Sequence, residues 1–146
     1  MAKDHLVCPA GHQAWRDWPF KLQAWSDPAA LPFKCPTCSE PMRWLGEWPP
    51  PKATPGQSRP FEVLYAALLD GGAPDGDRWP SEGYLPALIL CATPPGSTCH
   101  VLWPRYWVKP GAHVRFGQDG PQLTVAEWDY LTEKVRRFAA GRGIEL

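Results

Sequence analysis

Four side chains of the kind that bind metals stand in two pairs in the N-terminal third of the chain. The first pair forms a Cys-x3-His motif and the second a Cys-x2-Cys motif, with twenty-two residues between them. Short loops of this kind direct both ligands toward one centre, and three thiolates with one imidazole suit a tetrahedral zinc ion. We therefore predict a structural Zn²⁺ site that leaves no open position for water. Its ligands are Cys8, His12, Cys35 and Cys38.

The same residues also allow other arrangements. His5 is an alternative ligand near Cys8, but we favour His12 because it lies inside the loop and not in the approaching strand. Disulfides and buried thiols are the alternatives for the cysteines. Their odd number, five, favours the metal, and so does an N-terminus without the apolar core of a secretory signal.

The two motifs have the features of paired metal-binding turns. Gly11 stands in the first loop where the backbone needs a residue that tolerates positive φ, and apolar residues bracket both loops. Over residues 1–48 the chain resembles the zinc-ribbon family, with one motif on each knuckle. It departs from the family pattern at His12, in place of a fourth cysteine, and at Ser39, in place of a glycine. The resemblance implies a metal-dependent module of the kind found in accessory parts of the transcription machinery and among phage-encoded regulators.

The chain of 146 residues divides at a proline-rich stretch. Residues 49–60 favour extended, solvated backbone, which is typical of a linker. Residues 1–48 are too few to bury a stable core without a metal. We therefore predict a zinc-ribbon-like module at 1–48, a Pro-rich linker at 49–60 and a small module at 61–146.

The second module has the pattern of a small antiparallel sheet covered by a C-terminal helix, so the predicted class is α+β. Short apolar or alternating runs between turn residues predict strands at 61–69, 84–92, 99–108 and 113–116. The helix is predicted at 124–140, with a capping box from Thr124 to Glu127 and a stop at Gly141. The apolar face expected to pack on the sheet comprises Val125, Trp128, Leu131, Val135 and Phe138.

The charges balance, with fifteen basic and fifteen acidic side chains. A neutral chain lacks the basic surface that nucleic acid attracts, which lowers the expectation of a nucleic-acid partner. The sequence has no apolar run long enough to span a bilayer, and we expect a cytoplasmic protein.

Aromatic side chains offer two candidate binding regions. Those between the two metal motifs either form the core around the metal or stay exposed for a protein partner. Those of the second region alternate with cations, and they either stack on bases or belong to a half-buried strand with a basic side. The tentative binding residues are Trp15, Trp18 and Trp25 in the first region, and Trp103, Arg105, Tyr106, Trp107 and Lys109 in the second.

Catalytic signals are weak. Cys99 and His100 resemble a nucleophile beside a base, but neighbours on a strand point to opposite faces. With Cys91 and His113 they are also the candidates for a second metal site. We expect a non-enzymatic zinc-binding interaction or regulatory protein that docks on a protein assembly. A nucleic-acid-binding protein and a hydrolase-like enzyme are the alternatives.

Overall fold

The computed structural model places seven strands and the helix α2 within the residues that it describes. These residues are 3–17, 34–48, 59–69, 72–74, 84–108, 115–116 and 123–146. The chain forms two compact units. The first unit comprises Met1–Leu64 and Cys91–Val101, and the second comprises Tyr65–Leu90 and Leu102–Leu146.

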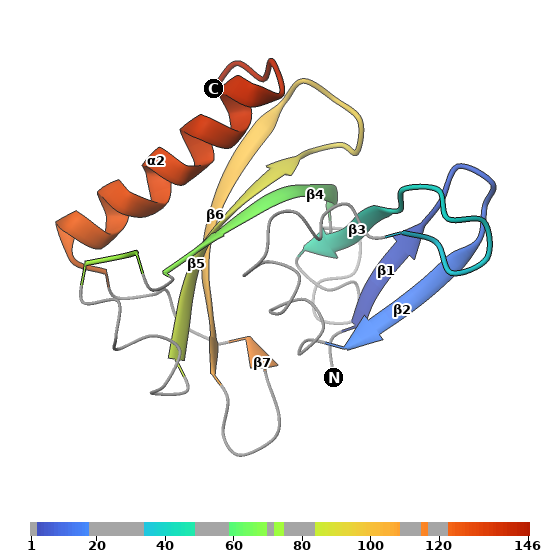
Figure 1. Ribbon diagram of the computed structural model, residues 1–146, viewed down its shortest axis with the longest axis horizontal. Coiled ribbons are helices and arrows are strands. Elements are labelled where there is room, and N and C mark those ends of the chain that lie inside the picture. The colour runs from blue at the N-terminus through green and yellow to red at the C-terminus, as the bar shows by residue number, and fades with distance from the viewer. Residues whose placement is uncertain are drawn as a thin grey trace. The chain divides into compact units, whose positions relative to one another are not determined.

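The strands hydrogen-bond to one another in the order β2-β1-β3-β4-β5-β6-β7 (Figure 1). The pairs β1–β2, β1–β3, β3–β4 and β6–β7 are antiparallel. The element bounds are β1 Lys3–Val7, β2 Gln13–Asp17, β3 Arg43–Trp48, β4 Arg59–Leu68, β5 Tyr84–Ala92, β6 His100–Val108, β7 Arg115–Phe116 and α2 Val125–Gly141.

In the first unit, the register of β1 against β3 decides where the two metal motifs lie. Leu6 pairs with Trp44, and Val7 pairs with Arg43. Because β1 ends at Val7 and β3 begins at Arg43, the loop that follows β1 and the loop that precedes β3 lie at the same end of this strand pair. Among the apolar side chains that flank these loops in the sequence, Leu6, Met42 and Trp44 are buried.

A glycine in β3 leaves room for an aromatic ring of β4. Gly46 pairs with Phe61, and a Cβ added at Gly46 would lie 2.6 Å from Cζ of the Phe61 ring. The aromatic ring therefore occupies the space that a side chain at position 46 would need, which is a known use of glycine inside a strand.

In the second unit, helix α2 begins with the predicted capping box. The Thr124 hydroxyl accepts a hydrogen bond from the Glu127 backbone N–H at 3.1 Å, and the Glu127 carboxylate accepts one from the Thr124 N–H at 3.0 Å. Two amides that a helix start leaves without partners are satisfied in this way. The buried residues of the helix repeat every fourth position and are Glu127, Leu131, Val135 and Ala139.

The helix packs against the C-terminal end of β4. The rings of Tyr65 and Phe138 are stacked, with centroids 4.5 Å apart. Lys134 Nζ donates a hydrogen bond to the backbone carbonyl of Leu68 at 3.1 Å. These contacts join the helix to the strand, in agreement with the α+β class.

The apolar face predicted for the helix was partly wrong. Leu131 and Val135 are buried as expected, but Val125 is 78% exposed and Trp128 is 39% exposed. The buried row starts instead at Glu127, whose carboxylate turns back into the capping box. The predicted row and the buried row share Leu131 and Val135. In the last turns they differ only by Phe138 or Ala139, which are both apolar, so spacing alone cannot tell the two rows apart.

The predicted stop at Gly141 was also wrong. The helix includes Gly141, and the left-handed residue is Gly143, with φ of 68°. The Gly143 N–H donates to the carbonyl of Ala140, and the Ile144 N–H donates to that of Ala139. This pair of bonds is the Schellman arrangement, which satisfies the last carbonyls of the helix.

The other predicted elements agree with the described residues. Strand β5 occupies the predicted range 84–92, and β6 and β7 lie within the predicted ranges 99–108 and 113–116. Strand β4 begins at Arg59, two residues before the predicted range 61–69, so Arg59 and Pro60 of the predicted linker belong to a strand. Residues 49–58 lie outside the described part of the chain, so the linker and the domain boundaries stay predictions. No helix within the described ranges has the length and hydropathy needed to cross a membrane.

Candidate metal centre

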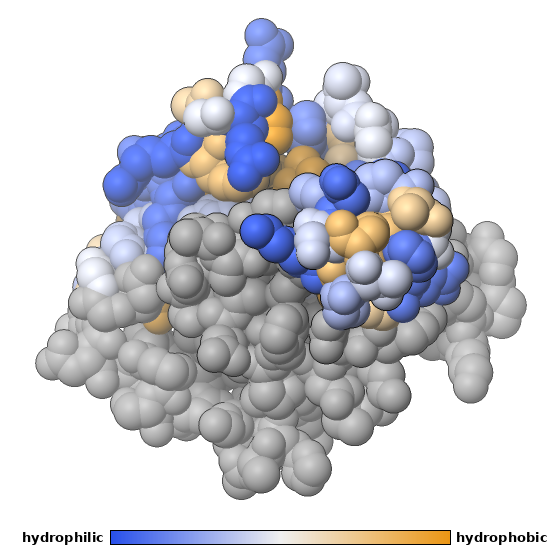
Figure 2. Space-filling model, turned by 45° about the vertical axis from the view of Figure 1, so that its right-hand side comes forward, coloured by the Kyte–Doolittle hydropathy of each residue, from blue (hydrophilic) through white to orange (hydrophobic). Residues whose placement is uncertain are grey.

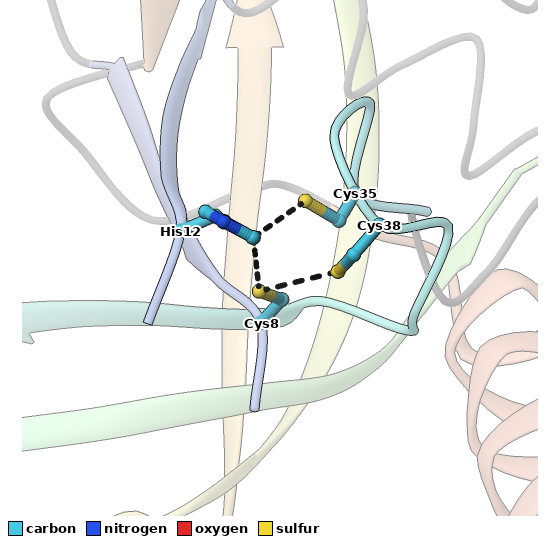
Figure 3. Close-up of side chains that lie close together, drawn as sticks. All are labelled: Cys8, His12, Cys35 and Cys38. Carbon is cyan, nitrogen blue, oxygen red and sulfur yellow. Dashed lines mark hydrogen bonds between the residues drawn. The ribbon is translucent and has the colours of Figure 1, made fainter. Parts of the chain in front are cut away.

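The two motifs meet in space. One side-chain ligand atom from each of four residues lies within 4.8 Å of all the others. Figure 3 shows the imidazole of one residue and the sulfurs of three pointing toward a common centre, from two separate loops. The four residues are Cys8, His12, Cys35 and Cys38.

The distances fit the edges of a tetrahedron around one metal ion. Zinc bonds of about 2.3 Å to sulfur and 2.0–2.1 Å to nitrogen give edges of about 3.8 Å between sulfurs and about 3.6 Å between sulfur and nitrogen. The Cys8 and Cys38 sulfurs are 3.7 Å apart, and His12 Nδ1 lies 3.6 Å from the Cys35 sulfur and 3.3 Å from that of Cys8. The four residues can therefore bind one metal ion, with Nδ1 as the nitrogen ligand.

Hydrogen bonds within the first loop hold Cys8 and His12 in place. The backbone N–H of Cys8 donates to the His12 carbonyl at 3.0 Å, and the Gly11 N–H donates to the Cys8 carbonyl at 2.9 Å. Gly11 has φ of 86°, as its position in the sequence predicts. The tight turn brings the imidazole back over the Cys8 sulfur.

The second loop is a short hairpin of its own. Lys34 and Pro41 form a bridge, the Cys35 N–H donates to the Glu40 carbonyl, and the Ser39 N–H donates to the Cys35 carbonyl. Ser39 has φ of 62°, which is the left-handed conformation. The serine therefore adopts the left-handed conformation that glycine adopts most readily, at the position where the zinc-ribbon pattern has a glycine.

Backbone amides of the second loop stabilise one thiolate. The N–H groups of Cys38 and, to a smaller degree, Thr37 point at the Cys35 sulfur and lower the pKa of Cys35 from 9.0 to about 6. The Glu40 N–H has the same effect on Cys38, but burial and the neighbouring Cys35 and Cys8 thiols outweigh it and raise the pKa of Cys38. The loop thus presents one sulfur in the ionised form that a metal requires.

Burial marks the site as enclosed. Cys8 and Cys35 are 4% and 2% exposed, whereas Cys38 and His12 are partly exposed. The alternative ligand His5 lies in β1, where its Nε2 is 3.3 Å from Gln13 Oε1. The structure thus brings His12, and not His5, to the cysteines.

All five cysteines are free thiols, so the disulfide alternative was wrong. The candidate second metal site of Cys91, Cys99, His100 and His113 is not formed among the described residues. Within these residues, the only cluster of metal-binding side chains is the one that contains Cys8. Cys91 is buried, and burial raises the pKa of its thiol to about 12. Cys99 is exposed, His100 is half-buried, and His113 lies outside the described residues.

The tentative binding residues are only partly described. Trp103 and Tyr106 are half-buried in β6. Trp18, Trp25 and Lys109 lie outside the described residues, as do the side chains of Trp15, Arg105 and Trp107. On the face drawn in Figure 2, small apolar areas alternate with hydrophilic ones over the described residues.

An ion pair that follows the second loop could not be predicted from the sequence. Arg43 donates to both carboxylate oxygens of Glu62, at 2.9 and 2.8 Å, and the Gly96 N–H donates to Glu62 Oε2 at 3.1 Å. The bonds and charge of Arg43 lower the pKa of Glu62. This arrangement joins the start of β3 to β4 and to the loop that contains Gly96, and it depends on a strand pairing that residue spacing does not reveal.

No family model, curated protein or solved structure matches this chain. The resemblance to zinc ribbons therefore rests on the spacing of the two motifs in the sequence.

Proposed function

We propose that Cys8, His12, Cys35 and Cys38 bind one structural Zn²⁺ ion in a ribbon-like module. The observation that supports this most strongly is that the four ligand atoms lie within 4.8 Å of one another. Three thiolates and an imidazole are soft and borderline ligands, which favour zinc over calcium, magnesium or manganese. An iron–sulfur cluster divides its cysteines between several irons, and it would need wider separations than the 3.3 to 3.7 Å found here.

The ion's role in this proposal is structural. Four protein ligands complete a tetrahedral shell, so no position is left for a substrate or a reactive water. Two of the three sulfurs are almost fully buried, which protects the bound ion. The ion would fix the ends of β1 and β3 in a unit whose large buried side chains, within the described residues, are few.

The whole chain, in this proposal, is a non-enzymatic protein that docks on a protein assembly through a surface held in shape by zinc. Its balanced charge supports a protein partner over nucleic acid, because binding to the phosphate backbone depends on an excess of basic groups.

The test begins with elemental analysis of purified protein, which should find one zinc ion per chain. EDTA should then weaken the near-UV circular dichroism, to which the buried Trp44 contributes, because metal binding and folding are coupled in small sites. A spectrum unchanged by EDTA contradicts the zinc site. Turnover of a small molecule, together with no macromolecular partner in a pull-down from zinc-containing buffer, contradicts the docking role.

A further inference from the structure

The cysteines of the cluster differ in their exposure to solvent. Cys38 is partly exposed, whereas Cys8 and Cys35 are 4% and 2% exposed. The Cys38 sulfur lies 3.7 Å from the Cys8 sulfur, although the two residues are thirty positions apart in the chain. Figure 3 shows this pair facing each other from different loops. A small oxidant that reaches the cluster therefore meets Cys38 first, with a second thiolate in contact behind it.

We propose that the site is a peroxide-sensitive switch in which oxidation joins Cys38 to Cys8 and releases the zinc ion. This inference rests on the proposed function, since it requires the four residues to hold zinc. It adds regulation to the structural site, because the more exposed Cys38 would react with hydrogen peroxide.

The reaction balances with peroxide as the sole oxidant. The Cys38 thiolate attacks one peroxide oxygen and the O–O bond breaks. Hydroxide departs, and Cys38 becomes a sulfenic acid. The Cys8 thiolate then attacks the Cys38 sulfur, the S–S bond forms, and the S–O bond breaks to release a second hydroxide. Two thiolates lose two electrons, and one peroxide gains them. The loss of two ligands of four frees the ion.

Cys8 is the second partner in this proposal because its sulfur lies 3.7 Å from the Cys38 sulfur across the two loops. Cys35 is the competing partner, because its sulfur contacts that of Cys38 within the second loop. The Cys8 sulfur needs to approach Cys38 by less than about 2 Å to reach the disulfide length of about 2.0 Å. The resulting bond would join the same two loops that the ion joins, so the oxidised module would keep its loops together after the ion has left.

The test uses the full zinc-loaded chain carrying Cys99→Ser, which removes the exposed cysteine outside the cluster. Hydrogen peroxide is added in an amount equal to that of the protein chain. Zinc release is followed with a chromophoric chelator, and disulfides are mapped by mass spectrometry of non-reduced peptides. We expect one zinc ion released for each Cys8–Cys38 disulfide, and recovery of zinc binding after treatment with dithiothreitol and zinc. A disulfide between Cys35 and Cys38, or zinc retained after peroxide treatment, overturns the proposal.

Two matched variants refine the test, because each replaces one thiolate by an imidazole and leaves four ligands. Cys35→His keeps the reactive pair and should release zinc at close to the parent rate. Cys38→His removes the exposed sulfur and should slow release by about tenfold or more, because the remaining thiolates are buried. Equal rates in the two variants refute the role of Cys38. If either variant fails to hold zinc, the disulfide map of the parent chain decides.

Different experimental results refute the zinc site and the peroxide switch. A purified chain that binds no zinc refutes the structural zinc site and the switch together. A chain that binds zinc, but keeps it in peroxide or forms another disulfide, refutes the switch alone.

Discussion

Cys8→Ser is the substitution that tests the metal centre most directly. The Cys8 sulfur lies 3.3 Å from His12 Nδ1 and 3.7 Å from the Cys38 sulfur, and it is 4% exposed. A serine hydroxyl is a harder, shorter ligand that stays protonated near neutral pH, so it does not replace the thiolate. We expect the variant to bind zinc much more weakly than the parent chain.

The size of the effect follows if the four ligands contribute equally. Structural zinc sites in small peptides have apparent binding free energies of about 10–16 kcal/mol at pH 7. Cys8 is one of four ligands, so its share is roughly a quarter of that, about 2.5–4 kcal/mol. This corresponds to an increase of roughly 10²–10³-fold in the dissociation constant for zinc.

The measurement is competition for zinc against a chromophoric chelator at fixed pH. Cys99→Ser is the matched control, because Cys99 is an exposed cysteine outside the cluster and its loss should leave the affinity unchanged. Equal zinc affinities for Cys8→Ser and Cys99→Ser would show that the four residues do not form a metal site, and the reasoning from their distances would be refuted.

Three further substitutions test the framework around the site by urea denaturation. Thr124→Ala should lower the unfolding free energy by about 1 kcal/mol, because it removes the capping bond to the helix; an unchanged midpoint contradicts this. Gly46→Ala should cost roughly 1–3 kcal/mol, because the new methyl group meets the Phe61 ring at 2.6 Å; Phe61→Leu in the same chain should recover part of it. Arg43 lowers the pKa of Glu62, so the stabilisation by this pair is present above the ordinary carboxyl pKa and is lost as pH falls through the lowered value. Glu62→Gln should therefore cost about 1 kcal/mol at pH 7 and nothing in strong acid, and an equal cost at both pH values contradicts the ion pair.

The metal ligands could be predicted from the sequence because their geometry is local. A Cys-x3-His or Cys-x2-Cys loop brings its own two ligands together through hydrogen bonds between near neighbours, as the bond from Gly11 to the Cys8 carbonyl shows. Strand β5 and the capping box at Thr124 were predictable for the same reason, since a run of apolar residues and a four-residue motif each act within a few positions.

What the sequence could not show depends on contacts between distant residues. The meeting of the two metal-binding loops follows from the pairing of β1 with β3, which places both loops at one end of the strand pair. The exposure of Trp128 follows from the side of α2 that meets Tyr65, and the spacing of apolar residues does not reveal that side. Residue types and short spacings thus determined the chemistry available to this protein. Only the tertiary structure decided which cysteine of the cluster is exposed to solvent and which sulfur lies beside it, because burial is a property of packing between segments far apart in the chain.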